Sequence, residues 1–262
     1  GKGGVGKTTL AALIIKYLAR LGEGAILAID ADPSSNLNLA LGLELEWTVG
    51  DIREDMLAQI QSSLTTGGAA MGSLPGGIAK RDYLDYQVRS SLSEGGAFDL
   101  IAMGRSEGPG CYCAVNHNLR QVIDAISKNY RYVVIDNEAG MEHLSRRTTR
   151  DVDLLLVISD PSQRGLAAAE RIAAFRHEID IHIHHAGLVL NRLRGELPSP
   201  LRERIEAMDI PLVGVIPDHQ ELLEAEIDGR PIIALSEASP IYQAVERMMV
   251  SLGYPAEKGI TS

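Results

Sequence analysis

The sequence has few cysteines, no long apolar run and no excess of positive charge. Two cysteines among 262 residues are too few for a disulfide framework, which favours a reducing cytoplasm over an extracellular compartment. No apolar run approaches the ~18 residues that a membrane-spanning helix needs. The formal net charge of −10 argues against a protein that coats DNA or an anionic membrane. We therefore expect a cytoplasmic protein that binds neither nucleic acid nor membrane, although a targeting signal ahead of Gly1 stays open.

What is present is an alternation of strand and helix patterns. Helical stripes lie between several of the apolar runs of strand length, which fall at residues 25–29, 98–103, 132–135, 154–158, 187–190 and 212–215. Continuous apolar strands that alternate with helices predict a three-layer α/β fold, with a mostly parallel central sheet and helices on both faces. We expect one domain over residues 1–262, with its first strand upstream of Gly1. The stretch at about 48–96 breaks the alternation, has a short helical pattern near 52–60, and is predicted to be a flexible or helical insertion.

The first nine residues form a phosphate-binding motif of the type G-x-x-x-x-G-K-[ST]. The glycines let backbone N–H groups converge on phosphate oxygens, and the helix that follows adds the positive end of its dipole. Lys7 is expected to reach the β- and γ-phosphates of ATP, and the Thr8 hydroxyl is expected to hold Mg²⁺. The predicted nucleotide-binding residues here are Gly1, Gly3, Gly4, Val5, Gly6, Lys7, Thr8 and Thr9.

A second lysine, Lys2, stands at the start of the same loop. One lysine already serves the phosphates from within the loop, so the second is best used on a neighbouring nucleotide. The whole motif resembles the deviant Walker A loop of the MinD/ParA/nitrogenase iron protein superfamily. That resemblance implies a homodimer closed around ATP, in which Lys2 crosses to the nucleotide of the partner.

Two further strand ends carry acids. Asp32 follows the strand at 25–29 and matches the first switch loop of the superfamily, which assigns it the task of orienting the attacking water, with Asp30 nearby. The alternative is that Asp32 only begins a turn. Asp136 ends the strand at 132–135 and is predicted to coordinate Mg²⁺ through water, with Gly140 as the pivot of the second switch loop. Asn191 and Arg192 resemble the adenine-contacting pair of the superfamily, and Pro217 occupies a similar strand end.

Both cysteines lie together, in Gly110-Cys111-Tyr112-Cys113. Random placement of two cysteines gives this spacing in about 0.8% of cases, so the pair is suggestive of a thiolate metal site. Two thiolates from one chain leave a tetrahedral or square-planar ion half coordinated, and a two-fold dimer supplies the other two. Cysteines packed as small apolar residues, or a redox pair, remain alternatives. The histidines at 182, 184 and 185 alternate near a strand start, which indicates a solvent face, and they are assigned no ligand role.

The segment 110–113 and the run from Asp136 to Arg146 together resemble the CooC-type nickel-insertion ATPases that mature carbon monoxide dehydrogenase. The resemblance implies an ATP- and Mg²⁺-dependent ATPase in which Cys111 and Cys113 of two subunits hold Ni²⁺, or Zn²⁺, and release it to that client enzyme. One rival is an iron–sulfur reductase like the nitrogenase iron protein, although a cluster held by one close pair per subunit would be unusual. The other rival is a ParA/MinD-like positioning ATPase, although the sequence shows no basic stripe or terminal amphipathic helix for it.

Overall fold

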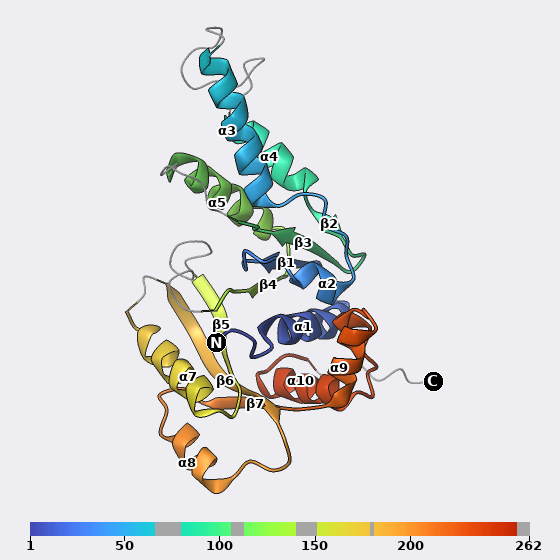
Figure 1. Cartoon of the computed structure of the whole chain (residues 1–262), viewed down its shortest axis with the longest axis vertical. Coiled ribbons are helices and arrows are strands. Elements are labelled where there is room, and N and C mark those ends of the chain that lie inside the picture. Colours follow the sequence, from blue (N-terminus) through green and yellow to red (C-terminus); the bar gives the residue numbers. More distant parts are fainter. Residues whose placement is uncertain (66–79, 106–112, 140–150, 179–180, 256–262) are drawn as a thin grey trace.

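Parallel strands form the frame of the protein, and in the computed structural model they lie in two sections (Figure 1). The structure describes residues 1–262 except 66–79, 106–112, 140–150, 179–180 and 256–262. For residues 60–65, 80–81, 113–118 and 120 it describes the backbone alone.

The first section has the strand order β2-β3-β1-β4. Its central strand β1 (Ile26–Asp30) is buried along its whole length and pairs in parallel with β3 (Phe98–Ala102) and β4 (Tyr132–Asp136). The short β2 (Ser93–Glu94) is antiparallel to β3. The register sets Asp30 beside Asp136, so two acids meet at the carboxyl ends of neighbouring strands.

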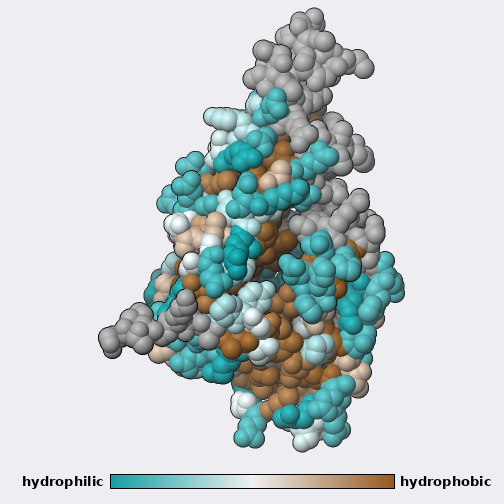
Figure 2. All heavy atoms as spheres, turned by 180° about the vertical axis from the view of Figure 1, so that it is seen from behind, coloured by the Kyte–Doolittle hydropathy of each residue, from teal (hydrophilic) through white to brown (hydrophobic). Residues whose placement is uncertain are grey.

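The second section has the order β5-β6-β7, and all of its pairs are parallel. It consists of β5 (Asp151–Ser159), β6 (His182–Leu193) and β7 (Leu212–Pro217). The carboxyl halves of β5 and β6 are buried, whereas their amino ends are exposed. Seen from behind, apolar atoms gather over the lower half of the molecule, the half that contains this section (Figure 2).

Helices cover both faces of the first section, as the alternation of side chains along β1 requires. The helices are α1 (Lys7–Leu21), α2 (Leu37–Leu41), α3 (Val49–Thr65), α4 (Lys80–Ser90), α5 (Cys113–Ser127), α7 (Gln163–Phe175), α8 (Ser199–Glu206), α9 (Gln220–Ile227) and α10 (Pro240–Ser251), with a 3₁₀ turn at Ile232–Ala234. Ile26 and Ala28 pack into one core cluster with α1 and α10, whereas Leu27 and Ile29 pack into another with α3, α4 and α5. A third cluster joins α7 and α8 to β5 and β6.

A slot separates β4 from β5, the two facing strands that have a single pairing partner each within the described residues. Both strands and α1 line a cavity of about 450 Å³ there, and Gly1 lies at its border. The strand expected upstream of Gly1 stays a prediction.

The expected three-layer α/β architecture is confirmed, and each of the six predicted strands is present, all of them with different bounds. The helix expected near 52–60 is present within the stretch at 48–96, which has more regular structure than a single short helix. This stretch contains α3, which is 17 residues long, as well as α4 and β2. Among the described helices, none is long and apolar enough to cross a bilayer.

Candidate functional site: the phosphate loop and its neighbours

The loop before α1 has the backbone of an anion-binding site. Gly4 and Gly6 have φ angles of 75° and 90°, in the left-handed region that residues with a Cβ rarely adopt. A Cβ on Gly6 would also lie 2.4 Å from the Asn191 amide nitrogen, so a glycine is required there on two grounds. The helix begins directly at Lys7, and its free N–H groups and positive dipole end face the loop.

Lys7 folds back over this loop. Its Nζ donates a hydrogen bond to the backbone carbonyl of Lys2 at 3.3 Å, so the ammonium group is held against its own loop. Lys2 is exposed. The exposed side chain of Lys2 is free to reach outward, whereas Lys7 is held within its own loop.

The two residues predicted to serve Mg²⁺, Thr8 directly and Asp136 through water, lie in direct contact. The Thr8 hydroxyl donates to Asp136 Oδ2 at 2.5 Å, which joins the start of α1 to the end of β4. Asp136 is only 3% exposed. Burial raises its pKa to about 6; the nearby carboxylates of Asp30 and Asp32 add to the rise, and the Thr8 hydroxyl and the Lys7 ammonium oppose it. A hydroxyl and a carboxylate at the mouth of a phosphate loop are the oxygen donors that Mg²⁺ prefers, so these residues fit the ion.

Asp30 and Asp32 organise the loop that follows β1. Buried Asp30 accepts hydrogen bonds from the backbone N–H of Asp32 at 3.0 Å and of Leu37 at 2.9 Å. Burial raises the pKa of Asp30, and these two backbone bonds oppose the rise. Asp32 Oδ1 accepts from the Ser34 N–H at 2.9 Å and from its hydroxyl at 2.5 Å. Asp32 thus begins a turn in this structure, and its role in orienting water stays a prediction.

Asn191 is hydrogen-bonded to the backbone of the phosphate loop. Its side chain is buried, and its Nδ2 donates to the Val5 carbonyl at 2.7 Å while its Oδ1 accepts from the Arg192 N–H at 2.9 Å. Arg192 is exposed and has a φ of 59°. The sequence predicted that this pair contacts the adenine, and it did not reveal the contact between Asn191 and the phosphate loop. That contact depends on how closely the fold brings β6 to the loop. The adenine contact stays a prediction.

Pro217 lies at the end of β7, next to the strand that carries Asn191. It pairs in register with Leu193, and the Asp218 N–H donates to the Leu193 carbonyl at 2.9 Å. The ends of β6 and β7 are therefore held together at the edge of the sheet where the phosphate loop lies. No described contact joins Pro217 to the loop itself.

The predicted metal-binding pair and the second switch glycine fall largely outside the described residues. Cys111 and Gly140 are not described, and of Cys113 the backbone alone is described, as the first residue of α5. The switch segment is visible up to Ala139, whose Cβ lies 3.9 Å from the point where a Cβ on Gly3 would be. The phosphate loop and the second switch loop are therefore neighbours.

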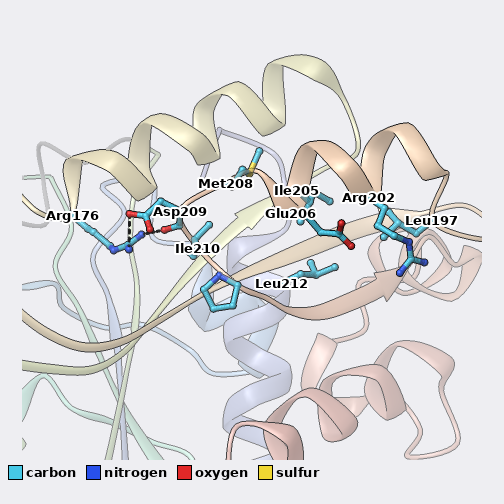
Figure 3. Close-up of a pocket in the computed structure, with 10 residues that line it drawn as sticks. Arg176, Leu197, Arg202, Ile205, Glu206, Met208, Asp209, Ile210 and Leu212 are labelled. Carbon is cyan, nitrogen blue, oxygen red and sulfur yellow. Dashed lines mark hydrogen bonds and ion pairs between the residues drawn. The ribbon is translucent and has the colours of Figure 1, made fainter.

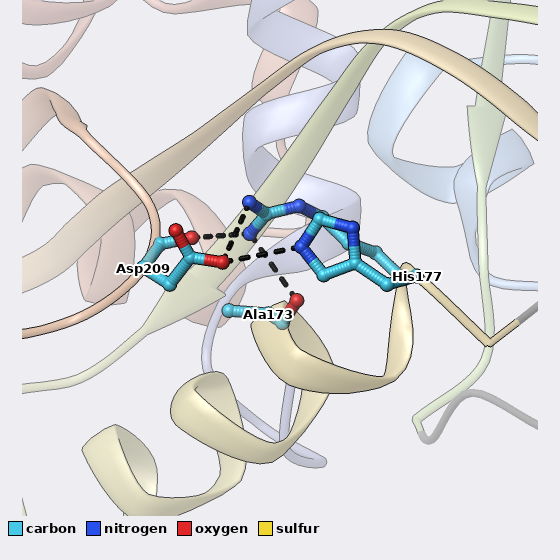
Figure 4. Close-up of polar contacts among 4 residues, drawn as sticks. Ala173, His177 and Asp209 are labelled. Carbon is cyan, nitrogen blue, oxygen red and sulfur yellow. Dashed lines mark hydrogen bonds and ion pairs between the residues drawn. The ribbon is translucent and has the colours of Figure 1, made fainter.

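A second hollow lies far from these loops, beside the residues that lead into β7. It has a volume of about 460 Å³, with Arg202 and Glu206 of α8 on its rim (Figure 3). The Arg176 guanidinium bonds the backbone carbonyl and the carboxylate of Asp209, and His177 lies 3.1 Å from the same carboxylate (Figure 4). Because it borders the amino end of β7, this hollow is not part of the phosphate site.

Comparison with known proteins agrees with this geometry. The family model described as the CobQ/CobB/MinD/ParA nucleotide binding domain matches residues 1–232. The chain is 42% identical over 248 residues to an uncharacterized ATP-binding protein of Methanocaldococcus jannaschii, covering 95% of this chain and 94% of that protein. It is 28% identical over 246 residues to the carbon monoxide dehydrogenase accessory protein CooC of Rhodospirillum rubrum, covering 91% and 89%.

Among solved structures, the MinD cell division protein of Aquifex aeolicus has a TM-score of 0.65 at 22% identity, with 97% of this chain and 94% of that chain covered. At this identity the likeness supports the fold alone. Three observations point to ATP hydrolysis: the left-handed glycines of the loop, the contact between Thr8 and Asp136, and the family match. The chain belongs to the CobQ/CobB/MinD/ParA family of nucleotide-binding domains and is a P-loop ATPase.

Proposed function

We propose that this ATPase is a metallochaperone. It takes up Ni²⁺ as cargo between the cysteine pairs of two subunits and delivers it to a client metalloenzyme, carbon monoxide dehydrogenase or a relative of it. The CooC relative supplies the client class, and Cys111-Tyr112-Cys113 supplies the thiolate donors. Zn²⁺ suits the same donors and is the competing cargo.

The observation that carries this proposal is the position of α5. Helix α5, which begins at Cys113 and ends at Ser127, connects two strands. It follows β3, which ends at Ala102, and precedes β4, which begins at Tyr132. Since β3 and β4 both run parallel to β1, the helix between them returns across the sheet, and its first residue belongs to the edge where the strands end. The backbone of Cys113 therefore shares this edge of the sheet with the phosphate loop, whereas Cys111 lies outside the described residues.

The packing of α5 provides a route from nucleotide to metal. Its apolar side chains at positions 119, 122, 123 and 126 lie in one core cluster with Leu27 and Ile29 of β1, and Ile135 of β4 packs against that cluster. Ile135 directly precedes Asp136, which contacts Thr8. A change at the end of β4 on γ-phosphate release is thus passed to the helix that begins with Cys113.

In this mechanism Lys7 and the backbone N–H groups of the loop bind the phosphates, and Lys2 reaches the ATP of the partner subunit. Thr8 directly, and Asp136 through water, would hold Mg²⁺, which when bound would offset charge on the β- and γ-phosphates. Asp32 orients a water molecule for attack on the γ-phosphorus. The bond to the β–γ bridging oxygen breaks, ADP leaves with that electron pair, and the proton of the water passes to solvent or phosphate. Closure of the dimer by ATP assembles four sulfurs around the ion, and hydrolysis opens the dimer and releases it.

The test is the metal stoichiometry of the Cys111→Ser and Cys113→Ser variants, with and without ATP. The native protein is expected to hold one Ni²⁺ per dimer at the cysteines, and each variant is expected to lose that ion while still binding ATP. Lys2→Ala is a matched control, because it keeps both cysteines but prevents closure of the dimer. Retention of the shared ion in both serine variants contradicts the proposal, and iron in anaerobically purified protein favours an iron–sulfur reductase instead.

A MinD-like positioning ATPase is the second candidate, because a MinD of Helicobacter pylori is 25% identical over 267 residues and covers 95% of this chain. Such a protein binds a surface in an ATP-dependent way. Co-sedimentation with anionic vesicles or DNA, compared with ATP and with ADP, separates the two functions. Binding that requires ATP supports positioning, whereas no binding in either state supports the metallochaperone.

A further inference from the structure

Two histidines and an aspartate meet at the exposed amino ends of β5 and β6. Asp151 and His182 are the first residues of these strands and pair in register, and His184 follows two residues later, on the same face as His182. We propose that Asp151, His182 and His184 form a binding site for a divalent transition-metal ion of the Zn²⁺ class. This proposal is independent of the metallochaperone function.

The contacts among the three side chains support this site. His184 Nε2 lies 2.9 Å from Asp151 Oδ1, and the rings of His182 and His184 meet edge to face with their centres 4.4 Å apart. One ligand atom from each residue lies within 4.8 Å of the other two. Ligands bonded at about 2.0–2.1 Å to a tetrahedral ion lie about 3.4 Å apart, so small rotations of exposed side chains bring the three atoms into place.

The donor set selects the kind of ion. Two imidazole nitrogens and one carboxylate oxygen suit Zn²⁺, Ni²⁺ or Cu²⁺, whereas Mg²⁺ and Ca²⁺ take oxygen ligands. Three protein ligands leave a position for water. The alternative without a metal is a solvated ion pair between His184 and Asp151, because both side chains are exposed. That pair explains one contact but does not explain why His182 lies against the same imidazole.

The site is separate from the phosphate loop. Strand β5 runs nine residues from Asp151 to Ser159, and its far end contacts the loop, where a Cβ on Gly1 would lie 2.3 Å from the Ile158 carbonyl oxygen. Eight steps along a strand span about 26 Å. An ion at Asp151 is therefore too far away to take part in ATP binding.

The experiment is calorimetric titration of the full chain without an affinity tag, with Zn²⁺ and separately with Ni²⁺. Cys111→Ser and Cys113→Ser are combined in every sample, so that thiolates contribute no binding. We expect one ion per chain. His182→Gln and His184→Gln should each weaken binding about tenfold or more, since even the loss of a group that only orients a metal ligand costs about 10–100-fold.

His185→Gln is the matched control, because His185 is exposed on the same strand but points to the other face. It should bind Zn²⁺ like its parent, and Zn²⁺ should raise the melting temperature of both by more than it raises that of the His184→Gln variant. Absence of Zn²⁺ and Ni²⁺ binding in the parent, or equal binding in all variants, overturns the proposal. A finding that the cysteines bind no shared nickel would not bear on the histidine site, so the two metal proposals can fail separately.

Discussion

Replacement of Asp136 by asparagine should stabilise the nucleotide-free protein while it abolishes ATP hydrolysis. Asp136 is 3% exposed, and burial raises its pKa from 3.8 to about 6. The folded protein therefore holds this proton more tightly than the unfolded chain does. The free energy of unfolding falls as the pH rises from about 4 through 6, by about 3 kcal/mol once the carboxylate is charged in both states. Asparagine carries no charge and keeps an oxygen that accepts the Thr8 hydroxyl.

The assay is urea unfolding of Asp136→Asn and the native protein at pH 8 and pH 5, without nucleotide or metal. We expect the variant to be more stable by about 3 kcal/mol at pH 8 and by about half of that at pH 5, where the native carboxyl is largely protonated. Asp153→Asn, which removes an exposed carboxylate from β5, should change stability by no more than about 0.5 kcal/mol. Equal gains at both pH values, or a loss at pH 8, would refute the reasoning.

The remaining predictions concern the phosphate loop. Lys7→Ala should abolish ATP binding in equilibrium dialysis, whereas Lys2→Ala should bind ATP as a monomer and fail to dimerise in sedimentation; equal behaviour of the two would remove the distinction between the lysines. Gly6→Ala should lower the melting temperature more than Gly4→Ala, because both strain the backbone by about 1 kcal/mol or more but only the first clashes with Asn191. Asn191→Ala should weaken ATP binding about tenfold through loss of its bond to the Val5 carbonyl, as measured by fluorescent nucleotide titration; unchanged affinity would show that the loop keeps its shape without it.

Most of the fold follows from local patterns in the sequence. The apolar runs predict the strands because a strand buried on both faces has no polar side, and the loop motif predicts where α1 begins. The insertion was harder to predict, because α3 and α4 bury only a few side chains each, such as Met56 and Leu84, and their remaining surface is polar. Periodicity is weak in such helices.

The candidate site was predictable in its residue types but not in its contacts. The motifs name Thr8 and Asp136, yet 128 positions separate them, and only the parallel register of β1 and β4 and the packing of α1 bring them together. The hydrogen bond between Asn191 and Val5 and the cluster around His184 arise in the same way. Each joins residues that are far apart in the sequence and that only the packing of the strands brings together. For the histidine cluster, the one local signal in the sequence is a His-x-His pattern at the start of one strand and an acid at the start of another.

The central claim is that ATP brings two copies of this chain together around one metal ion. Native mass spectrometry of the His184→Gln variant, with a non-hydrolysable ATP analogue, Mg²⁺ and Ni²⁺, tests it directly, because that background weakens the proposed histidine site. The account predicts a dimer that carries two nucleotides and one nickel ion, and a dimer without nickel when Cys113 is also replaced by serine. A nucleotide-bound monomer at every workable protein concentration would contradict it.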